Sequence, residues 1–407
     1  MSRKLVRADI LLQVVADQDR VFSTRDVSED DRVRQAHPAL TRHSLYHAFI
    51  GGALSDHRDA LGIEEIRKST SRGSLWEKQG RSSNDRPPSR DVPAPAAVAN
   101  TEESFDLGPQ YGGDSPFKAR MRLHQSWYRA VILRLPFGTG PTPNASSHYG
   151  NMLTREDGAA GRNFLTPEIA EIARRRVAQG YGTIEAYRLF HNMLSSQPMC
   201  LNIFGPLVND PVRATRMIAA LVPDPVTEVT RVAIEWAPDP AETYLADRTA
   251  FDVLIEYRTT DGRLCALGVE TKLTEPFSQK EYDGERYRRW MRVPNAPWRP
   301  DADRAVHLIA HNQLWRDHLL AVALSAHPRS PYNVARLMLV HHPADRDCVR
   351  ILEGYRQLLR DDDDSLLDMP LDRLIELWSP LVESASEQTW LSDLRLRYLD
   401  LDKSTTT

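Results

Sequence analysis

The sequence predicts an α/β protein in which helices flank a mixed sheet, preceded by a smaller α+β domain. Apolar runs of strand length alternate with helical patterns over the last three quarters of the chain, which is typical of α/β folds. A segment rich in Pro, Ser and Ala, QGRSSNDRPPSRDVPAPAAVANTEES, separates this part from the N-terminal region. We therefore expect a small domain in residues 1–78, a linker in residues 79–115 and the main domain in residues 116–407.

The composition favours a globular protein. The 407 residues are 41% hydrophobic and 27% charged, and no apolar run reaches the length of a transmembrane helix, so no membrane partner is expected. Cys200, Cys265 and Cys348 are odd in number and lack a metal-binding spacing. They suggest a reducing compartment, and we expect a cytoplasmic protein without a signal peptide. The net charge of −4 does not exclude nucleic acid, because local patches decide phosphate binding.

The stretch Ala250–Thr274 reads as two apolar strands joined by a polar turn. If the loop has three residues, Thr259 pairs with Arg263, and counting outward places Asp252 opposite Glu270. A cross-strand pair lies about 5 Å apart. The sequence therefore predicts two neighbouring carboxylates on a hairpin that is otherwise apolar.

Lys272 follows Glu270 by two residues and so shares its face of the strand. Two carboxylates this close repel each other unless a cation lies between them. Paired carboxylate oxygens hold Mg²⁺, which acidifies a bound water and neutralises phosphoryl charge. A neighbouring lysine can orient the attacking water and stabilise the developing charge. The alternative is an exposed edge hairpin with a surface salt bridge.

The pattern D-x(17)-E-x-K resembles the PD-(D/E)XK nuclease superfamily, although Phe251 stands where the motif has proline. The resemblance implies a restriction-endonuclease-like αβββαβ core with helical additions. Strands at 230–237, 250–257 and 264–273 suit this order, and we expect further strands at Ala305–Ala310 and Ala335–Val340. The phrases QSWYR, NFLTPEI, SSQPMCLNIFGPL and GVETKLTEPF are similar to a bacterial subgroup of restriction-type nucleases.

The resemblance implies an endonuclease that cuts DNA with Mg²⁺ or Mn²⁺, in restriction or phage defence. Asp252 and Glu270 would hold the metal, and Lys272 would assist the attacking water. Glu185, in a predicted helix at 183–195, and Gln279, in a predicted helix at 277–293, would support them; otherwise Glu185 is a helix-dipole glutamate. A catalytically silent DNA-binding or protein-interaction module and an RNA nuclease are the alternatives. A homodimer and a partner protein both stay open.

Residues 1–78 resemble a winged helix-turn-helix, since three predicted helices precede a hairpin with a basic tip at 67–73. In that fold the third helix enters the major groove and the wing contacts the DNA backbone. The main domain carries basic residues among aromatics at 277–293, which suits a phosphate-rich ligand. A protein-interaction domain, a helical cap and a solvated helix face are the alternatives. The residues expected to contact nucleic acid are Arg42, His43, Ser44, His47, Arg67, Lys68, Arg72, Lys280 and Arg286.

Two further segments have open interpretations. Pro136–Asn163 reads as a long loop, which either closes over substrate or lies on the surface. His341 and His342 follow a predicted strand, and they either bind metal or form partly exposed polar surface.

Overall fold

The computed structural model describes residues 105–140, 148–180, 184–306 and 308–405. In the N-terminal region it describes the strands Val21–Ser23, Ile63–Ser69 and Gly73–Lys78 and residues 11, 13–15, 27–28, 33–34, 50 and 54. The chain divides into two compact units, Met1–Glu102 and Glu103–Thr407. The boundary between them falls within the segment expected to be a linker.

The first unit contains an antiparallel sheet of β1 (Val21–Ser23), β2 (Ile63–Ser69) and β3 (Gly73–Lys78), in the order β1-β3-β2. The expected hairpin is present, but its strands are longer than predicted. Arg67 pairs with Leu75 and Lys68 pairs with Ser74, so both basic residues lie within β2 and not in the tip. The other expected DNA contacts of this unit fall outside the described residues: Arg42, His43, Ser44, His47 and Arg72.

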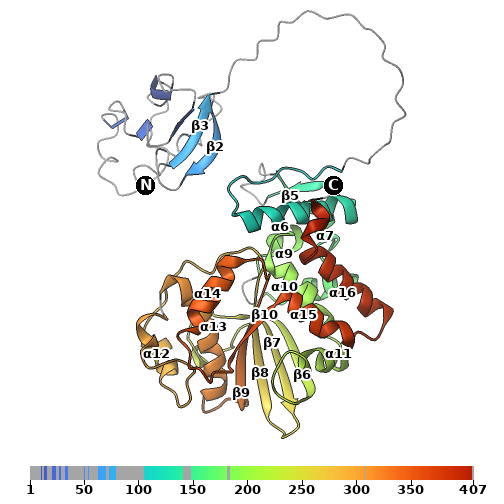
Figure 1. Cartoon of the computed structure of the whole chain (residues 1–407), viewed down its shortest axis with the longest axis vertical. Coiled ribbons are helices and arrows are strands. Elements are labelled where there is room, and N and C mark those ends of the chain that lie inside the picture. Colours follow the sequence, from blue (N-terminus) through green and yellow to red (C-terminus); the bar gives the residue numbers. More distant parts are fainter. Residues whose placement is uncertain are drawn as a thin grey trace, which may run out of the picture. The chain divides into compact units, whose positions relative to one another are not determined.

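The second unit is built on a five-stranded mixed sheet in the order β10-β9-β8-β7-β6 (Figure 1). β6 to β8 are antiparallel neighbours, and β9 and β10 continue the sheet parallel to β8. This confirms the expected mixed sheet flanked by helices. The strands are β6 (Val226–Trp236), β7 (Phe251–Thr259), β8 (Leu264–Lys272), β9 (Val334–His341) and β10 (Leu366–Pro370).

Helices cover both faces of this sheet, and each face has its own apolar core (Figure 1). One core includes residues of α8 (Pro167–Ala178), α9 (Ala186–His191), α10 (Ser196–Phe204), α11 (Pro211–Ala219), α15 (Leu371–Trp378) and α16 (Ala385–Tyr398). The other includes residues of α12 (Glu285–Met291), α13 (Ile309–Ala326) and α14 (Arg346–Arg356). Thr166 caps α8, because its side chain accepts a bond from Ile169 N.

A smaller layer precedes the sheet in the chain. α6 (Pro116–Trp127) runs into a π-helical turn, η2 (Tyr128–Ile132). The segment expected to be a long loop holds the hairpin of β4 (Phe137–Thr139) and β5 (His148–Leu153), followed by α7 (Arg155–Ala159). That expectation was therefore wrong for its described part. Short 3-10 turns lie at Gly205–Leu207, Ala241–Thr243, Ala302–Arg304, Ser379–Leu381 and Leu401–Ser404.

The central hairpin has the predicted register. Thr259 N donates to Arg263 O at 3.1 Å across the three-residue loop, and Gly262 there has a φ of +82°. Val253 pairs with Val269 at the far end of the ladder, so the next position places Asp252 across from Glu270. The register holds because the turn and the alternation of side chains both specify it.

Several predicted elements differ from the observed ones. The described residues of 305–310 form no strand: α13 begins at Ile309, and Val306 is buried in the apolar core that also includes residues of this helix. The last strand, β10, was missed because its apolar run is only a few residues long. The helix expected at 183–195 is shorter, since Ser195 caps a separate helix, α10. The helix expected at 277–293 is reduced to α12.

Gly268 on β8 leaves room for Phe251, the residue that replaces the motif's proline. A Cβ atom on Gly268 would lie 2.5 Å from the Phe251 ring. The Phe251 ring in turn stacks on Trp236 of β6, with centroids 6.0 Å apart. The ring and the glycine are therefore packed as a pair next to Asp252.

We expect Gly268→Ala to lower the melting temperature, because overpacking a buried site costs about 1–3 kcal/mol. Phe251→Leu in the same chain should recover part of the loss, since it shortens the clashing group. Gly112→Ala is the matched control, because nothing lies within 4 Å of its added Cβ. Equal melting temperatures for Gly268→Ala and Gly112→Ala would contradict this account.

Candidate active site

Three neighbouring strands bring three carboxylates into one row. Ile234 pairs with Val253 and Trp236 with Phe251, so Glu235 lies across from Asp252, which in turn lies across from Glu270. Glu235 is buried and has a φ of 51°, which is uncommon for a residue with a side chain. The sequence placed Glu235 in a strand but gave it no role. Its signal was an acid at the end of the strand that precedes the hairpin.

Asp252 is held by hydrogen bonds from the neighbouring strand. Its Oδ2 accepts from the backbone N of Thr271 at 2.7 Å and from Thr271 Oγ1 at 2.6 Å. Burial raises the pKa of Asp252 well above its usual range, and the negative charges of Glu270 and Glu235 raise it further. The Thr271 bonds oppose this rise without cancelling it. The acids therefore repel one another in the absence of a cation.

Lys272 and Glu270 form a buried ion pair, with Nζ 3.0 Å from Oε1. Burial by itself lowers the pKa of the Lys272 ammonium. The charge and hydrogen bond of Glu270, together with the charges of Asp252 and Asp317, outweigh burial, so this pKa stands above its ordinary value. The ammonium also lies 4.9 Å from the centroid of the Phe277 ring. Lys272 is thus a fixed positive charge beside the acids.

Gln313, at the start of α13, links the two members of this ion pair. Its Nε2 donates to Glu270 Oε1 at 2.7 Å, and its Oε1 accepts from Lys272 Nζ at 3.2 Å and from Ser278 N at 2.8 Å. From the sequence, we expected Gln279 to support the acids and the lysine. That side chain is exposed on the irregular segment before α12 and bonds Phe277 O at 2.9 Å. Gln313 was missed, although it begins the long helix that follows the site strands.

Glu185 lies in the wall of the same cavity but serves its own helix. It is the N-cap of α9, with Oε1 accepting from Tyr187 N at 3.1 Å and Oε2 from Arg188 N at 2.7 Å. Its expected supporting role remains a prediction, and its position at the N-terminus of α9 also suits the alternative, a glutamate that interacts with the helix dipole.

A cavity of about 430 Å³ opens over these groups. The acids line it, and arginines stand among them. Arg316 bonds Thr249 Oγ1 at 2.6 Å and pairs with Asp247 at 3.3 Å, and Arg188 lies 3.5 Å from Glu275. The lining residues are Glu185, Arg188, Ser196, Gln197, Glu235, Arg248, Thr249, Ala250, Asp252, Glu270, Lys272, Glu275, Pro276, Ser278, Gln313, Arg316 and Asp317. Acids together with arginines suit a metal ion and a phosphate.

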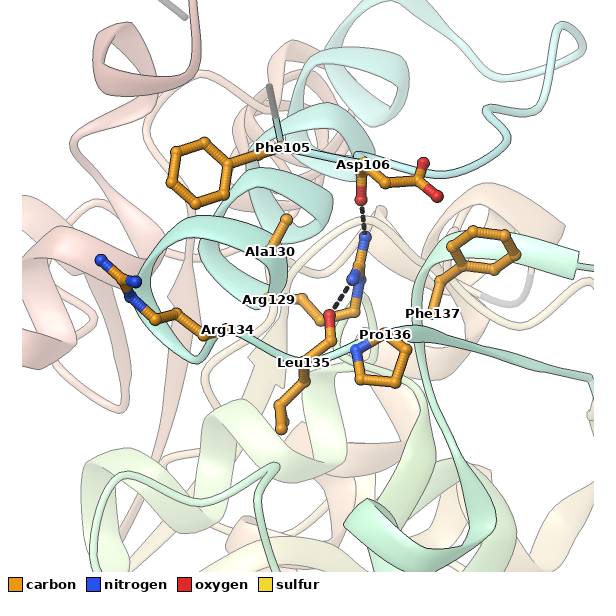
Figure 2. A pocket seen from close by; sticks show the side chains of 8 residues that line it. All are labelled: Phe105, Asp106, Arg129, Ala130, Arg134, Leu135, Pro136 and Phe137. Atoms are coloured by element: carbon orange, nitrogen blue, oxygen red, sulfur yellow. Dashed lines mark hydrogen bonds between the residues drawn. The ribbon is translucent and has the colours of Figure 1, made fainter. Parts of the chain in front are cut away.

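A larger cavity of about 610 Å³ lies between residues 105–106, η2 and the start of β4, and it lacks this chemistry (Figure 2). Figure 2 shows Arg129 bonded to the main-chain oxygens of Asp106 and Leu135. Gly150 O accepts a third bond from the same guanidinium, at 2.7 Å. Arg129 therefore ties three backbone segments together.

The remaining sequence-predicted residues of this unit lie apart from the acid row. Arg286 bonds Ala246 O at 3.0 Å and Tyr287 Oη at 2.7 Å, and Lys280 is exposed; neither lines the cavity. His341 and His342 are buried, contrary to the expected partly exposed surface. His341 Nε2 is 2.8 Å from Asp368 Oδ1, and burial lowers the pKa of His342 to about 4.

The donor set fits a hydrated divalent ion better than a closed metal cage. Among the described residues, no group of three His, Cys, Asp or Glu side chains could hold a metal ion alone. Asp252 and Glu270 offer carboxylate oxygens, which Mg²⁺ accepts in ones and twos while keeping several waters. The pKa of Asp252, raised by burial and by the charges of Glu270 and Glu235, favours a further cation there beside the Lys272 ammonium.

The mixed α/β sheet thus brings together two acids on adjacent strands, a lysine two residues after the second acid, and a helix glutamine bonded to both members of the ion pair. Residues 112–400 match a family model described as the PD-(D/E)XK nuclease superfamily. The chain belongs to this superfamily. No match was found among curated proteins or among solved structures.

Two other sequence expectations concern contact with a membrane and the state of the cysteines. No helix in the described ranges is long and apolar enough to cross a membrane. Cys200, Cys265 and Cys348 are buried free thiols.

We expect Asp252→Asn to raise the melting temperature of metal-free protein at pH 8. The pKa of Asp252 is raised in the folded protein. Wild-type protein therefore has its full stability below the unfolded pKa of about 3.9 and loses stability as the pH rises through the folded pKa. Asparagine does not titrate, so the gap between variant and wild type should shrink toward pH 4. Thermal melts in EDTA across this range measure it, at about 2–4 °C per kcal/mol.

Asp301→Asn is the control for this series, because Asp301 is exposed and makes no cap bond. It should follow wild type at every pH. An Asp252→Asn protein that melts below wild type at pH 8 would show that the Thr271 bonds outweigh the repulsion.

Proposed function

We propose that this protein is a divalent-metal-dependent endonuclease that hydrolyses phosphodiester bonds in DNA. The single observation that carries the proposal is the assembly of Asp252, Glu270, Lys272 and Gln313 around one cavity. Superfamily membership supports nuclease chemistry. The similarity to restriction-type nucleases supports a setting in restriction or phage defence, and the expected ion is Mg²⁺ or Mn²⁺.

Asp252 and Glu270 would hold the ion. Lys272 and Gln313 both bond Oε1 of Glu270 and do not use its Oε2, which leaves that oxygen for a metal. When bound, such an ion lowers the pKa of a water and neutralises charge on the phosphoryl oxygens. The Thr271 bonds keep Asp252 in place for this task.

Lys272 would act on the reacting phosphate. Its ammonium is protonated and fixed by Glu270 and Gln313, so it can stabilise charge that develops on the phosphoryl oxygens and orient the attacking water. The cavity arginines, Arg188, Arg248 and Arg316, offer positive charge for the flanking phosphates. The chain thus supplies charge of both signs within one cavity.

We expect Asp252→Ala, Glu270→Ala and Lys272→Ala to lower plasmid cleavage by roughly 10²–10³-fold or more, since each removes charge stabilisation from the reacting phosphate. Lys272→Arg should not restore it, because a guanidinium differs in reach and geometry from an ammonium. Gln313→Ala should also lose activity, and Gln279→Ala is its matched control. The assay compares plasmid, linear duplex and RNA, with Mg²⁺ and with EDTA.

Full activity in any of the first three variants would place the chemistry elsewhere. Cleavage of RNA alone would favour the RNA nuclease. Wild-type protein that binds DNA but never cuts, and melts identically with and without Mg²⁺, would favour the silent binding module.

The N-terminal residues 1–78 would supply affinity for DNA, as a winged-helix-like domain joined through residues 79–115. The family match covers residues 112–400 and therefore excludes residues 1–78. All of the proposed catalytic residues lie within the matched range. Interactions of the N-terminal domain with DNA would then add to binding and leave the chemistry to the second unit.

We expect a chain without residues 1–102 to bind duplex DNA more weakly, because each bidentate hydrogen-bond pair between a side chain and a base edge contributes about 1–3 kcal/mol. The shortened chain should keep metal-dependent cleavage at high protein concentration. Gel-shift titration in EDTA and cleavage with Mg²⁺ measure the two properties separately. A folded truncated protein that binds DNA as tightly as the whole chain would refute the role of the N-terminal unit alone.

A further inference from the structure

Asp317 is a further acid that lines the cavity, and the proposed mechanism does not use it. It lies on α13 four residues after Gln313, so both side chains point from the same face of the helix. Only 4% of the residue is exposed, and it lines the cavity. It is therefore a buried carboxylate next to the acid row.

The Oδ2 atom of Asp317 is buried and has no hydrogen-bond partner among the described residues. Its neighbour Arg316 is already paired with Asp247 and bonded to Thr249. Burial raises the pKa of Asp317 well above its usual range, and the charge of Glu270 adds to this rise, while Arg316 and Lys272 oppose it. A buried carboxylate without hydrogen bonds destabilises a fold unless something else satisfies it.

Asp224 offers a comparison, because it is a buried carboxylate whose oxygen is bonded within the fold. Its Oδ2 accepts from Tyr257 Oη at 2.6 Å and also from Arg336 Nη1. Asp224 is 9% exposed, close to Asp317 in burial, yet its oxygen is bonded twice. The unsatisfied oxygen of Asp317 is thus not explained by burial alone, and it belongs to a residue that lines the cavity where a cation is expected.

We propose that Asp317 is a positioning residue for the divalent ion, whose water ligands donate hydrogen bonds to its carboxylate. The inference rests on the proposed function. Asp317 completes no three-residue metal cage in the described part of the chain, so it fits an outer position better than a direct one. Mg²⁺ keeps several waters when it binds to one or two carboxylates, and outer carboxylates orient such ligands. Asp317 also adds negative charge where the ion's positive charge arrives.

The test measures Asp317→Asn without nucleic acid, by thermal melts of the whole chain at pH 8 in EDTA and in a Mg²⁺ or Mn²⁺ titration. In EDTA the variant should melt above wild type, because it removes an unsatisfied charge. The metal concentration that gives half of the stabilisation should rise about 10–100-fold. The two effects have opposite signs, which a merely structural role does not produce.

Asp224→Asn is the matched control. It should melt below wild type in EDTA, because it weakens two bonds, and its metal midpoint should stay at the wild-type value. The proposal is overturned if Asp317→Asn keeps the wild-type metal midpoint, and also if it melts lower in EDTA or fails to fold. Wild-type protein that gains no stability from either metal overturns the proposed metal dependence together with this inference.

Discussion

Repulsion among Glu235, Asp252 and Glu270 is the constraint that the hydrogen bonds and the ion pair of this site have to offset. Two buried carboxylates and a half-buried one on adjacent strands separate unless the backbone holds them. The hairpin register sets Asp252 across from Glu270, and Thr271 bonds Asp252 from the next strand. Lys272 and Gln313 hold Glu270 through an ion pair and a hydrogen bond. Several internal bonds of the fold thus serve to keep like charges together.

The strand residues of the site were predictable because their placement depends on local rules. Alternation along a strand and the chemistry of a three-residue loop specify which side chains meet across a hairpin. Asp252, Glu270 and Lys272 follow from these rules alone, and the observed register agrees with them. The mixed sheet was implied by the resemblance to the superfamily together with the order of apolar runs, although the run at 305–310 does not form a strand and β10 was not predicted.

The residues contributed by other elements were not predictable from the same rules. Gln313 reaches the site from a helix 43 residues after Glu270, and the apolar run at 305–310 suggested a strand where the chain enters that helix. Gln279 is the nearer glutamine in sequence, but it lies on an irregular segment before α12 and does not line the cavity. Glu235 acquires its place through pairing with β7, which a single strand does not reveal. Tertiary packing decides all three.

Arg176 gives α8 a direct hold on the backbone of the acid row. Its guanidinium donates to Ile234 O and to Glu235 O, both at 2.7 Å, from a position 58 residues before Ile234 in the chain. These bonds support the left-handed conformation of Glu235. Because these bonds fix the backbone at Glu235, the helix layer helps to set where this cavity carboxylate lies.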